Sequence, residues 1–309
     1  MLPIYFAPLQ GYTDDVYRRI HQQFIGGVKY YYTPFVRVEA GSIRSKDLRD
    51  IAPDNNKGVP VVPQIIFNSV KEFEYLTNRV EEMGYKQIDL NMGCPFPLQA
   101  KHKRGSGILQ HPGIVEEIID KIKQYPDIEF SVKMRLGWEN EEEIEQIMPI
   151  LNKVDFQHIT IHPRTGIQQY KGNVNYSALE RLCKISRNHL IINGDITTLE
   201  QMREIEEQYP QIAGIMIGRG LLRTPSLAYE YSNGCEWSTR ERIALMLKMH
   251  DALMAEYSKI LKGDTQMLNK MRTFWEYAEN LIGRKPYKKV MKSGNLKNYL
   301  AAVQELKFI

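Results

Sequence analysis

Eight short apolar runs alternate with amphipathic segments over residues 1–232, and this alternation restricts the possible folds more than any other feature of the chain. Most runs contain β-branched or aromatic residues and are flanked by turn residues, as buried strands are. The predicted strands are residues 4–8, 28–33, 61–67, 87–92, 130–135, 158–163, 190–194 and 213–218. Helical periodicity between them predicts helices at 13–24, 69–83, 112–124, 140–152, 175–186, 198–208 and 219–230.

Eight strands with intervening helices in about 230 residues predict an α/β fold, a (β/α)8 TIM barrel. The alternative is a doubly wound parallel sheet. That fold normally carries a glycine-rich phosphate loop after its first strand. The end of the first run and the residues after it read APLQGYTDD (7–15), which is not such a loop. The barrel is therefore the favoured prediction.

The alternation stops at Asn233-Gly234. Residues 238–309 show helical periodicity only, interrupted at Gly263, Gly283, Pro286 and Gly294. We therefore predict two domains, a barrel over residues 1–234 and a small C-terminal helical bundle over residues 235–309.

The charge is distributed unevenly between these two regions. Residues 236–309 contain 14 Lys and Arg against 8 Asp and Glu, a net charge of +6, whereas residues 1–235 carry −2. A basic tail on a slightly acidic body favours an anionic partner for the tail, nucleic acid above all, although a solvated helical face gives the same pattern.

Several protein classes are disfavoured. No apolar run reaches the roughly 18 residues of a membrane span, and the N-terminus lacks the basic and apolar regions of a signal peptide. The cysteines at 94, 183 and 235 have no framework spacing, and an odd number without an export signal predicts reduced thiols. We expect a cytoplasmic protein with no membrane contact, no metal site and no obligatory protein partner.

Polar residues gather at the ends of the predicted strands, where barrel enzymes place their reacting groups. They are Ala7–Gln10, Gln64, Asn91–Pro95, Lys133 and Arg135, His162–Thr165, Asn193–Asp195, and Gly218–Gly220. Because polar groups inside barrel strands need partners, a polar ligand at this rim explains them better than solubility does.

Cys94 lies in a Gly-Cys-Pro turn at one strand end. A lone cysteine is often a small buried apolar residue, but Gly93 allows close approach of a ligand and a protonated thiol can act as a general acid. Both interpretations stay open on the residues alone. Cys183 and Cys235 are interpreted as structural.

The other rim residues also admit two interpretations each. Lys133, inside an apolar strand, requires either an anionic ligand or a buried salt bridge. The segments at 193–195 and 218–220 could hold a phosphate through backbone N–H groups and Arg219. His162 is as readily a core histidine as a functional one, and the basic run at 101–104 is either a solvated loop or part of the site.

Together these segments closely resemble the signature of the tRNA-dihydrouridine synthases. The resemblance rests first on LNMGCPFP at 90–97 and KHKRGSGIL at 101–109. Matching motifs follow in the same order across the whole predicted barrel: Ala7-Pro8 with Thr13-Asp14 and Arg18, Lys133–Gly137, His162–Thr165, Asn193–Asp195 and Gly218-Arg219. Pro97 and His102 are most similar to the bacterial branch called DusC.

This resemblance implies flavin mononucleotide (FMN) in the barrel mouth, NADPH as the reductant and tRNA as the substrate. A hydride from the reduced flavin would reach C6 of a uridine, and Cys94 would protonate C5. The expected cofactor-binding residues are Pro8, Leu9, Gln10, Gln64, Lys133, His162, Asn193, Gly194, Asp195, Gly218 and Arg219. The expected substrate-binding residues are Asn91, Lys101, His102, Arg135 and Arg164.

The chain departs from the family pattern at Leu9-Gln10-Gly11, where many members have Met and a small residue. We expect little consequence, because contacts there are made by the backbone. Two alternatives remain: an FMN-dependent barrel oxidoreductase of a small molecule, like dihydroorotate dehydrogenase, and a non-catalytic RNA-binding protein.

Overall fold

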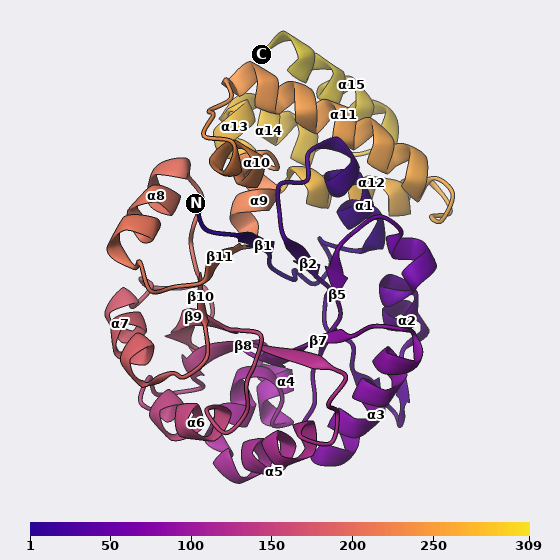
Figure 1. Ribbon diagram of the computed structural model, residues 1–309. Helices are drawn as coiled ribbons and strands as arrows, with labels where there is room; N and C mark the ends of the chain where they lie inside the picture. The colour runs from indigo at the N-terminus through magenta and orange to yellow at the C-terminus, as the bar shows by residue number, and fades with distance from the viewer.

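Nine strand segments form one parallel sheet that closes into a barrel, surrounded by helices (Figure 1). The computed structural model describes residues 1–309. The strand order is β5-β2-β1-β11-β10-β9-β8-β7-β6. Its two end segments, β5 and β6, are consecutive in the chain and are separated only by Pro63, which has no N–H for the ladder. The nine segments are thus the eight predicted strands with the third divided, and the doubly wound sheet is wrong.

The barrel strands agree closely with the predicted apolar runs. They are β1 Ile4–Phe6, β2 Tyr30–Tyr32, β5 Val61–Val62, β6 Gln64–Ile65, β7 Gln87–Met92, β8 Glu129–Gly137, β9 Ile159–Thr165, β10 Leu190–Asn193 and β11 Gly214–Ile217. A short antiparallel hairpin, β3 Val38–Glu39 with β4 Ser42–Ile43, lies outside the barrel and was not predicted.

Helices follow the strands as the periodicity predicts, with one correction. They are α1 Asp15–Phe24, α3 Val70–Glu82, α5 Pro112–Ile122, α6 Glu143–Leu151, α7 Tyr176–Ile185 and α8 Leu199–Gln208. The single helix predicted over 219–230 is wrong: it is α9 Arg219–Arg223 and α10 Leu227–Ser232. Pro225 lies between them and cannot continue a helix from the preceding turn. The loops add two unpredicted short helices, α2 Ser45–Ile51 and α4 Pro97–Lys101.

The tail contains helices only: α11 Thr239–Tyr257, α12 Asp264–Trp275, α13 Glu279–Ile282, α14 Arg284–Met291 and α15 Leu296–Gln304. Its centre is Trp275, which is fully buried and donates its indole N–H to the Tyr299 hydroxyl at 3.0 Å. Gly263 and Gly283 have positive φ angles at the starts of α12 and α14, so these two predicted breaks fall between helices, as does Gly294. The break predicted at Pro286 is wrong, because Pro286 lies in the first turn of α14, where a helix tolerates proline.

The tail packs against the barrel beside α1 (Figure 1). One hydrophobic core runs through both. Polar contacts converge on Asp14, the N-cap of α1. Its carboxylate accepts a hydrogen bond from the Tyr257 hydroxyl at 2.7 Å and pairs with Lys270 at 2.8 Å. Lys270 also donates to the Gly11 carbonyl at 3.1 Å. The tail is therefore fixed to the loop that follows β1, at the carboxyl end of the barrel. The domain boundary at residue 234 stays a prediction.

None of the helices is both long enough and apolar enough to cross a membrane.

Candidate active site at the barrel mouth

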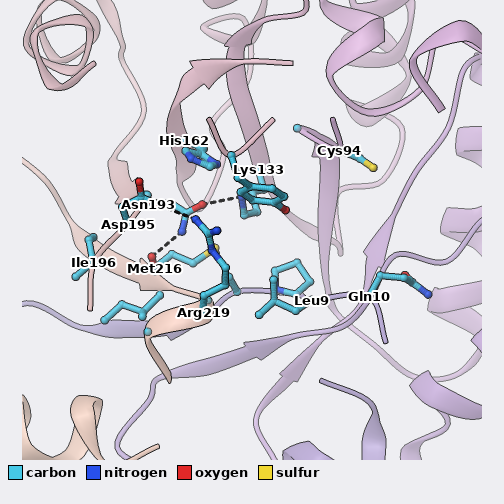
Figure 2. Close-up of a pocket in the computed structure, with 18 of the residues that line it drawn as sticks. Leu9, Gln10, Cys94, Lys133, His162, Asn193, Asp195, Ile196, Met216 and Arg219 are labelled. Carbon is cyan, nitrogen blue, oxygen red and sulfur yellow. Dashed lines mark hydrogen bonds and ion pairs between the residues drawn. The ribbon is translucent and has the colours of Figure 1, made fainter. Parts of the chain in front are cut away.

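A cavity of about 550 Å³ opens at the carboxyl ends of the strands, within the size range of cofactor and small-molecule sites. Figure 2 shows Cys94 on one side of it, Asp195 on the other, and Lys133 between them. Every predicted cofactor-binding residue lines this cavity, as do Cys94, Asn91 and Arg135. The structure thus brings together residues that are far apart in the chain, because parallel strands present their carboxyl ends at one rim.

Lys133 extends from the middle of β8 into the cavity. Its only hydrogen bond is to the Asn193 side-chain oxygen at 2.9 Å, and the Asn193 amide donates in turn to the Met216 carbonyl at 2.8 Å (Figure 2). Burial, with a smaller effect of Arg135, lowers the pKa of Lys133 to about 8. Two of the three ammonium donors therefore have no protein acceptor and remain for a ligand. No carboxylate forms the buried salt bridge that was the alternative.

Asp195 binds two arginines on the cavity wall opposite Cys94. Arg219 donates to one carboxylate oxygen at 2.6 Å, and Arg164 forms an ion pair with the other. Burial acts to raise the pKa of Asp195, but the two guanidinium groups outweigh it and lower that pKa overall. Gly194 and Asp195 have φ angles of 134° and 48°, so this turn is held in a left-handed conformation.

Arg164 itself is 1% exposed and does not line the cavity. It donates to the Gly172 carbonyl at 2.7 Å and contacts His162 Nε2 at 3.1 Å. Its guanidinium is bonded to Asp195 and His162, two residues that do line the cavity. The predicted substrate contact of Arg164 stays a prediction.

His162 lies deeply buried against four cations. Burial, and then Arg135, Lys133, Arg164 and Arg219, lower its pKa well below the usual value. Arginine can only donate, so the Nε2 atom that contacts Arg164 must accept and the proton lies on Nδ1. His162 is thus a neutral imidazole with a fixed tautomer.

Cys94 follows β7 in a turn that is tightly constrained. Its N–H donates to the Asn91 side-chain oxygen at 2.9 Å, and its carbonyl accepts from the Ser106 hydroxyl at 2.9 Å. A Cβ on Gly105, whose φ is 58°, would lie 2.7 Å from the Cys94 Cβ, which explains a glycine there. Burial raises the pKa of the Cys94 thiol, so the group keeps its proton to higher pH than an exposed cysteine.

Arg135 connects two loops at the cavity wall. Its guanidinium donates to the carbonyls of Gly93, Thr165 and Gln169 at 3.0, 2.8 and 2.7 Å. The Tyr170 ring lies 5.5 Å from this guanidinium and 4.5 Å from that of Arg219. The loop after β9 is thereby held against both arginines.

Lys101 and His102 are exposed at the end of α4 and lie outside the cavity lining. A substrate would reach them only by extending over the surface beyond Cys94.

The cavity lining also includes residues that were not predicted, among them Phe35, Tyr170, Arg223 and Tyr277. Arg223 could have been found, because it lies four positions after Arg219 and i, i+4 residues share a helix face. Tyr277 comes from the tail, between α12 and α13, and its ring lies 5.6 Å from that of Tyr12. No local pattern marks it, since its position depends on how the tail packs.

The chain is similar to known proteins in both sequence and fold. The family described as dihydrouridine synthase (Dus) matches residues 5–308. The probable tRNA-dihydrouridine synthase 2 of Bacillus subtilis (strain 168) is 30% identical over 263 residues, covering 82% of this chain and 78% of that protein.

Two solved structures share the fold at low identity. Histamine dehydrogenase from Rhizobium sp. 4-9 matches with a TM-score of 0.56 at 12% identity, over 82% of this chain and 48% of that longer one. Morphinone reductase matches with a TM-score of 0.55 at 9% identity, over 76% and 87% of the two chains. With the family match along nearly its whole length, the chain belongs to the dihydrouridine synthase family.

Proposed function

We propose that this protein reduces the C5–C6 double bond of a uridine in tRNA, with FMN as cofactor, NADPH as reductant and Cys94 as proton donor. The observation that carries the proposal is the Cys94 thiol at the rim of a cavity that Lys133, Arg135, Arg219 and Arg223 also line. Membership of the family supports tRNA as the substrate, and the dihydrouridine product follows from the reaction that the family name describes.

The residues present fit a flavin mononucleotide. Its phosphate requires cationic donors, which Arg219 and Arg223 supply on one wall together with the backbone of Gly218. The polar edge of its ring requires donors deeper in the barrel, and Lys133 has two to offer. When bound, the flavin supplies the hydride, and the protein supplies orientation and one proton.

Cys94 is the best candidate for the acid among the lining residues. Adding hydride to an electron-poor alkene leaves a carbanion-like centre that must be protonated, and the raised pKa of Cys94 keeps its proton available at neutral pH. His162 is a poorer donor, because it is neutral and its lowered pKa excludes the imidazolium form. Lys133 could also donate, with its pKa of about 8, but the proposal assigns its free donors to the ring edge of the cofactor.

The tail and the mouth are suited to hold folded RNA. A target base must leave its stack to enter a cavity of this kind. The tail carries the surplus of positive charge, and Arg284, Lys285 and Lys288 on α14 are exposed and form no ion pairs. Cationic groups there would bind phosphates without reading sequence.

The test is in two parts. Purified protein is expected to show flavin absorption, with FMN released on denaturation. With NADPH, it is expected to form dihydrouridine in tRNA transcripts, measured by nucleoside mass spectrometry. A flavoprotein that oxidises NADPH but neither binds nor modifies tRNA would instead indicate a small-molecule reductase. A colourless protein that binds tRNA, even after incubation with FMN, would indicate a non-catalytic RNA-binding protein.

A further inference from the structure

Asp89 is a buried acidic residue that touches the cavity only through other side chains. It lies in the middle of β7, is 0% exposed and is absent from the cavity lining. One carboxylate oxygen accepts from the Gln64 amide at 2.6 Å, and the other accepts from the Ser131 hydroxyl at 2.6 Å. A buried carboxylate is costly unless it is paired and hydrogen-bonded, so these two acceptor contacts help to keep Asp89 in the core.

The hydrogen bonds continue from Asp89 to the turn of Cys94. The Gln64 side-chain oxygen accepts from the Asn91 amide at 2.6 Å. The Asn91 side-chain oxygen then accepts from the N–H groups of Gly93 and Cys94, at 3.1 and 2.9 Å. The side chains of Asp89, Gln64 and Asn91 thus form one continuous chain of hydrogen bonds that ends at the backbone N–H of Cys94.

This chain of hydrogen bonds has only one possible direction. The backbone N–H groups at one end can only donate, and an ionised carboxylate at the other end can only accept. Each amide must therefore direct its oxygen toward the Cys94 end and its NH₂ toward the Asp89 end. The orientation of Gln64 and Asn91 follows from the two ends, and does not depend on how amide oxygen and nitrogen are assigned.

We propose that Asp89 is a positioning residue for the reaction: by accepting from Gln64 it fixes the orientations of Gln64 and Asn91, and thereby holds the Cys94 turn. The proposal rests on the proposed function in one respect, that Cys94 is the acid. It also restricts Asn91, whose oxygen is fully used by two N–H groups. Asn91 can offer the cavity only its second amide hydrogen, so it can bind only an accepting atom of the substrate.

The burial and charge around Asp89 support this role. Burial raises the pKa of Asp89 to about 6, while hydrogen bonds from Gln64 and Ser131 and the charge of Lys133 act in the opposite direction. Because a pKa of about 6 is still below neutral pH, the Asp89 carboxylate is ionised there and can only accept hydrogen bonds.

The test compares Asp89→Ala with Asp89→Asn and Ser131→Ala. Asp89→Ala removes the acceptor of Gln64. Asp89→Asn keeps one, because its oxygen can face Gln64 while its NH₂ donates to the Ser131 oxygen. Ser131→Ala is the matched control: it removes a buried hydrogen bond of the same carboxylate without touching Gln64.

Two readouts need neither tRNA nor turnover: hydrogen–deuterium exchange of the Gly93 and Cys94 amides, and the rate of Cys94 alkylation by iodoacetamide. In Asp89→Ala, exchange is expected to rise by roughly tenfold, the equivalent of one ordinary hydrogen bond, and alkylation is expected to accelerate. Asp89→Asn and Ser131→Ala are expected to stay within about twofold of wild type on the same scale. In turnover, Asp89→Ala should lower kcat with little change in KM for tRNA.

Unchanged exchange at Gly93 and Cys94 in a folded Asp89→Ala protein would overturn the proposal, as would an equal rise in Ser131→Ala. If Asp89→Ala does not fold, Gln64→Met removes the middle member of the chain of hydrogen bonds and must show the same increase. The exchange and alkylation measurements do not involve reduction of tRNA. They can therefore support the role of Asp89 even if the protein does not reduce tRNA, and they can refute that role even if it does.

Discussion

Replacing Cys94 by alanine tests the proposed chemistry most directly. The substitution deletes one sulfur atom, so the stability cost is on the order of 1 kcal/mol and the protein should stay folded. Asn91 and Ser106 form hydrogen bonds with the Cys94 backbone, which alanine retains. The flavin, the reductant and the base should therefore bind as before, and only the proton is removed.

The expected effect is confined to one half-reaction. A positioned general acid contributes about 10²–10⁴ in rate, so reoxidation of the reduced flavin by tRNA should slow by that factor. Flavin reduction by NADPH should be nearly unchanged, because it does not use the thiol. Rapid-mixing absorbance measurements separate the two steps. Cys94→Ser should be almost as slow, since a hydroxyl is a far weaker acid than a thiol.

The control is Cys183→Ala, since Cys183 lies in α7 and outside the cavity lining. It should match wild type in both half-reactions. If reoxidation in Cys94→Ala is as fast as in wild type, Cys94 is not the proton donor. Lys133 is then the next acid to test. Its pKa of about 8 predicts that a lysine-supplied proton would be lost as the pH rises through that value.

Three further predictions concern the cations of the site and the tail. Lys133→Met should weaken flavin binding yet raise the free energy of unfolding by roughly 1–3 kcal/mol at pH 7. The reason is that folding lowers the pKa of Lys133 from 10.5 to about 8, so the charged side chain opposes folding below pH 8. This penalty is relieved between pH 8 and 10.5. A Lys133→Met protein that is less stable than wild type in urea unfolding would contradict this prediction. Arg219→Ala should lower FMN affinity by roughly 10–100-fold, the worth of one charge-assisted phosphate contact, measured by fluorescence titration; unchanged affinity would place the phosphate elsewhere. Replacing Arg284, Lys285 and Lys288 together with alanine should weaken tRNA binding and reduce the slope of log Kd against log salt by about 0.7–0.9 for each phosphate that the tail no longer neutralises. As a control, the triple variant should contain as much FMN as wild type. A salt slope equal to that of wild type would show that α14 does not bind RNA.

Much of this site could be predicted because barrel geometry converts sequence position into spatial position. Period-2 and period-3.6 patterns mark strands and helices through neighbours only a few residues apart. Once eight strands run parallel, their carboxyl ends must meet at one rim, and Gln64, Lys133, His162 and Asn193 all line the same cavity. The split of the last barrel helix at Pro225 was also readable from the sequence, since a proline interrupts the helical hydrogen bonds.

The sequence by itself determined the strands, the rim and the charge of the tail. Only the tertiary structure decided which polar groups face the cavity and which support it. Arg164 and Asp89 read as rim or strand residues, yet both are buried and bonded to partners that are up to 42 residues away along the chain. Tyr277 reaches the cavity because Asp14 binds both Tyr257 and Lys270 and so fixes the tail beside β1. Such placements depend on packing between distant segments, and local periodicity carries no information about contacts at that separation.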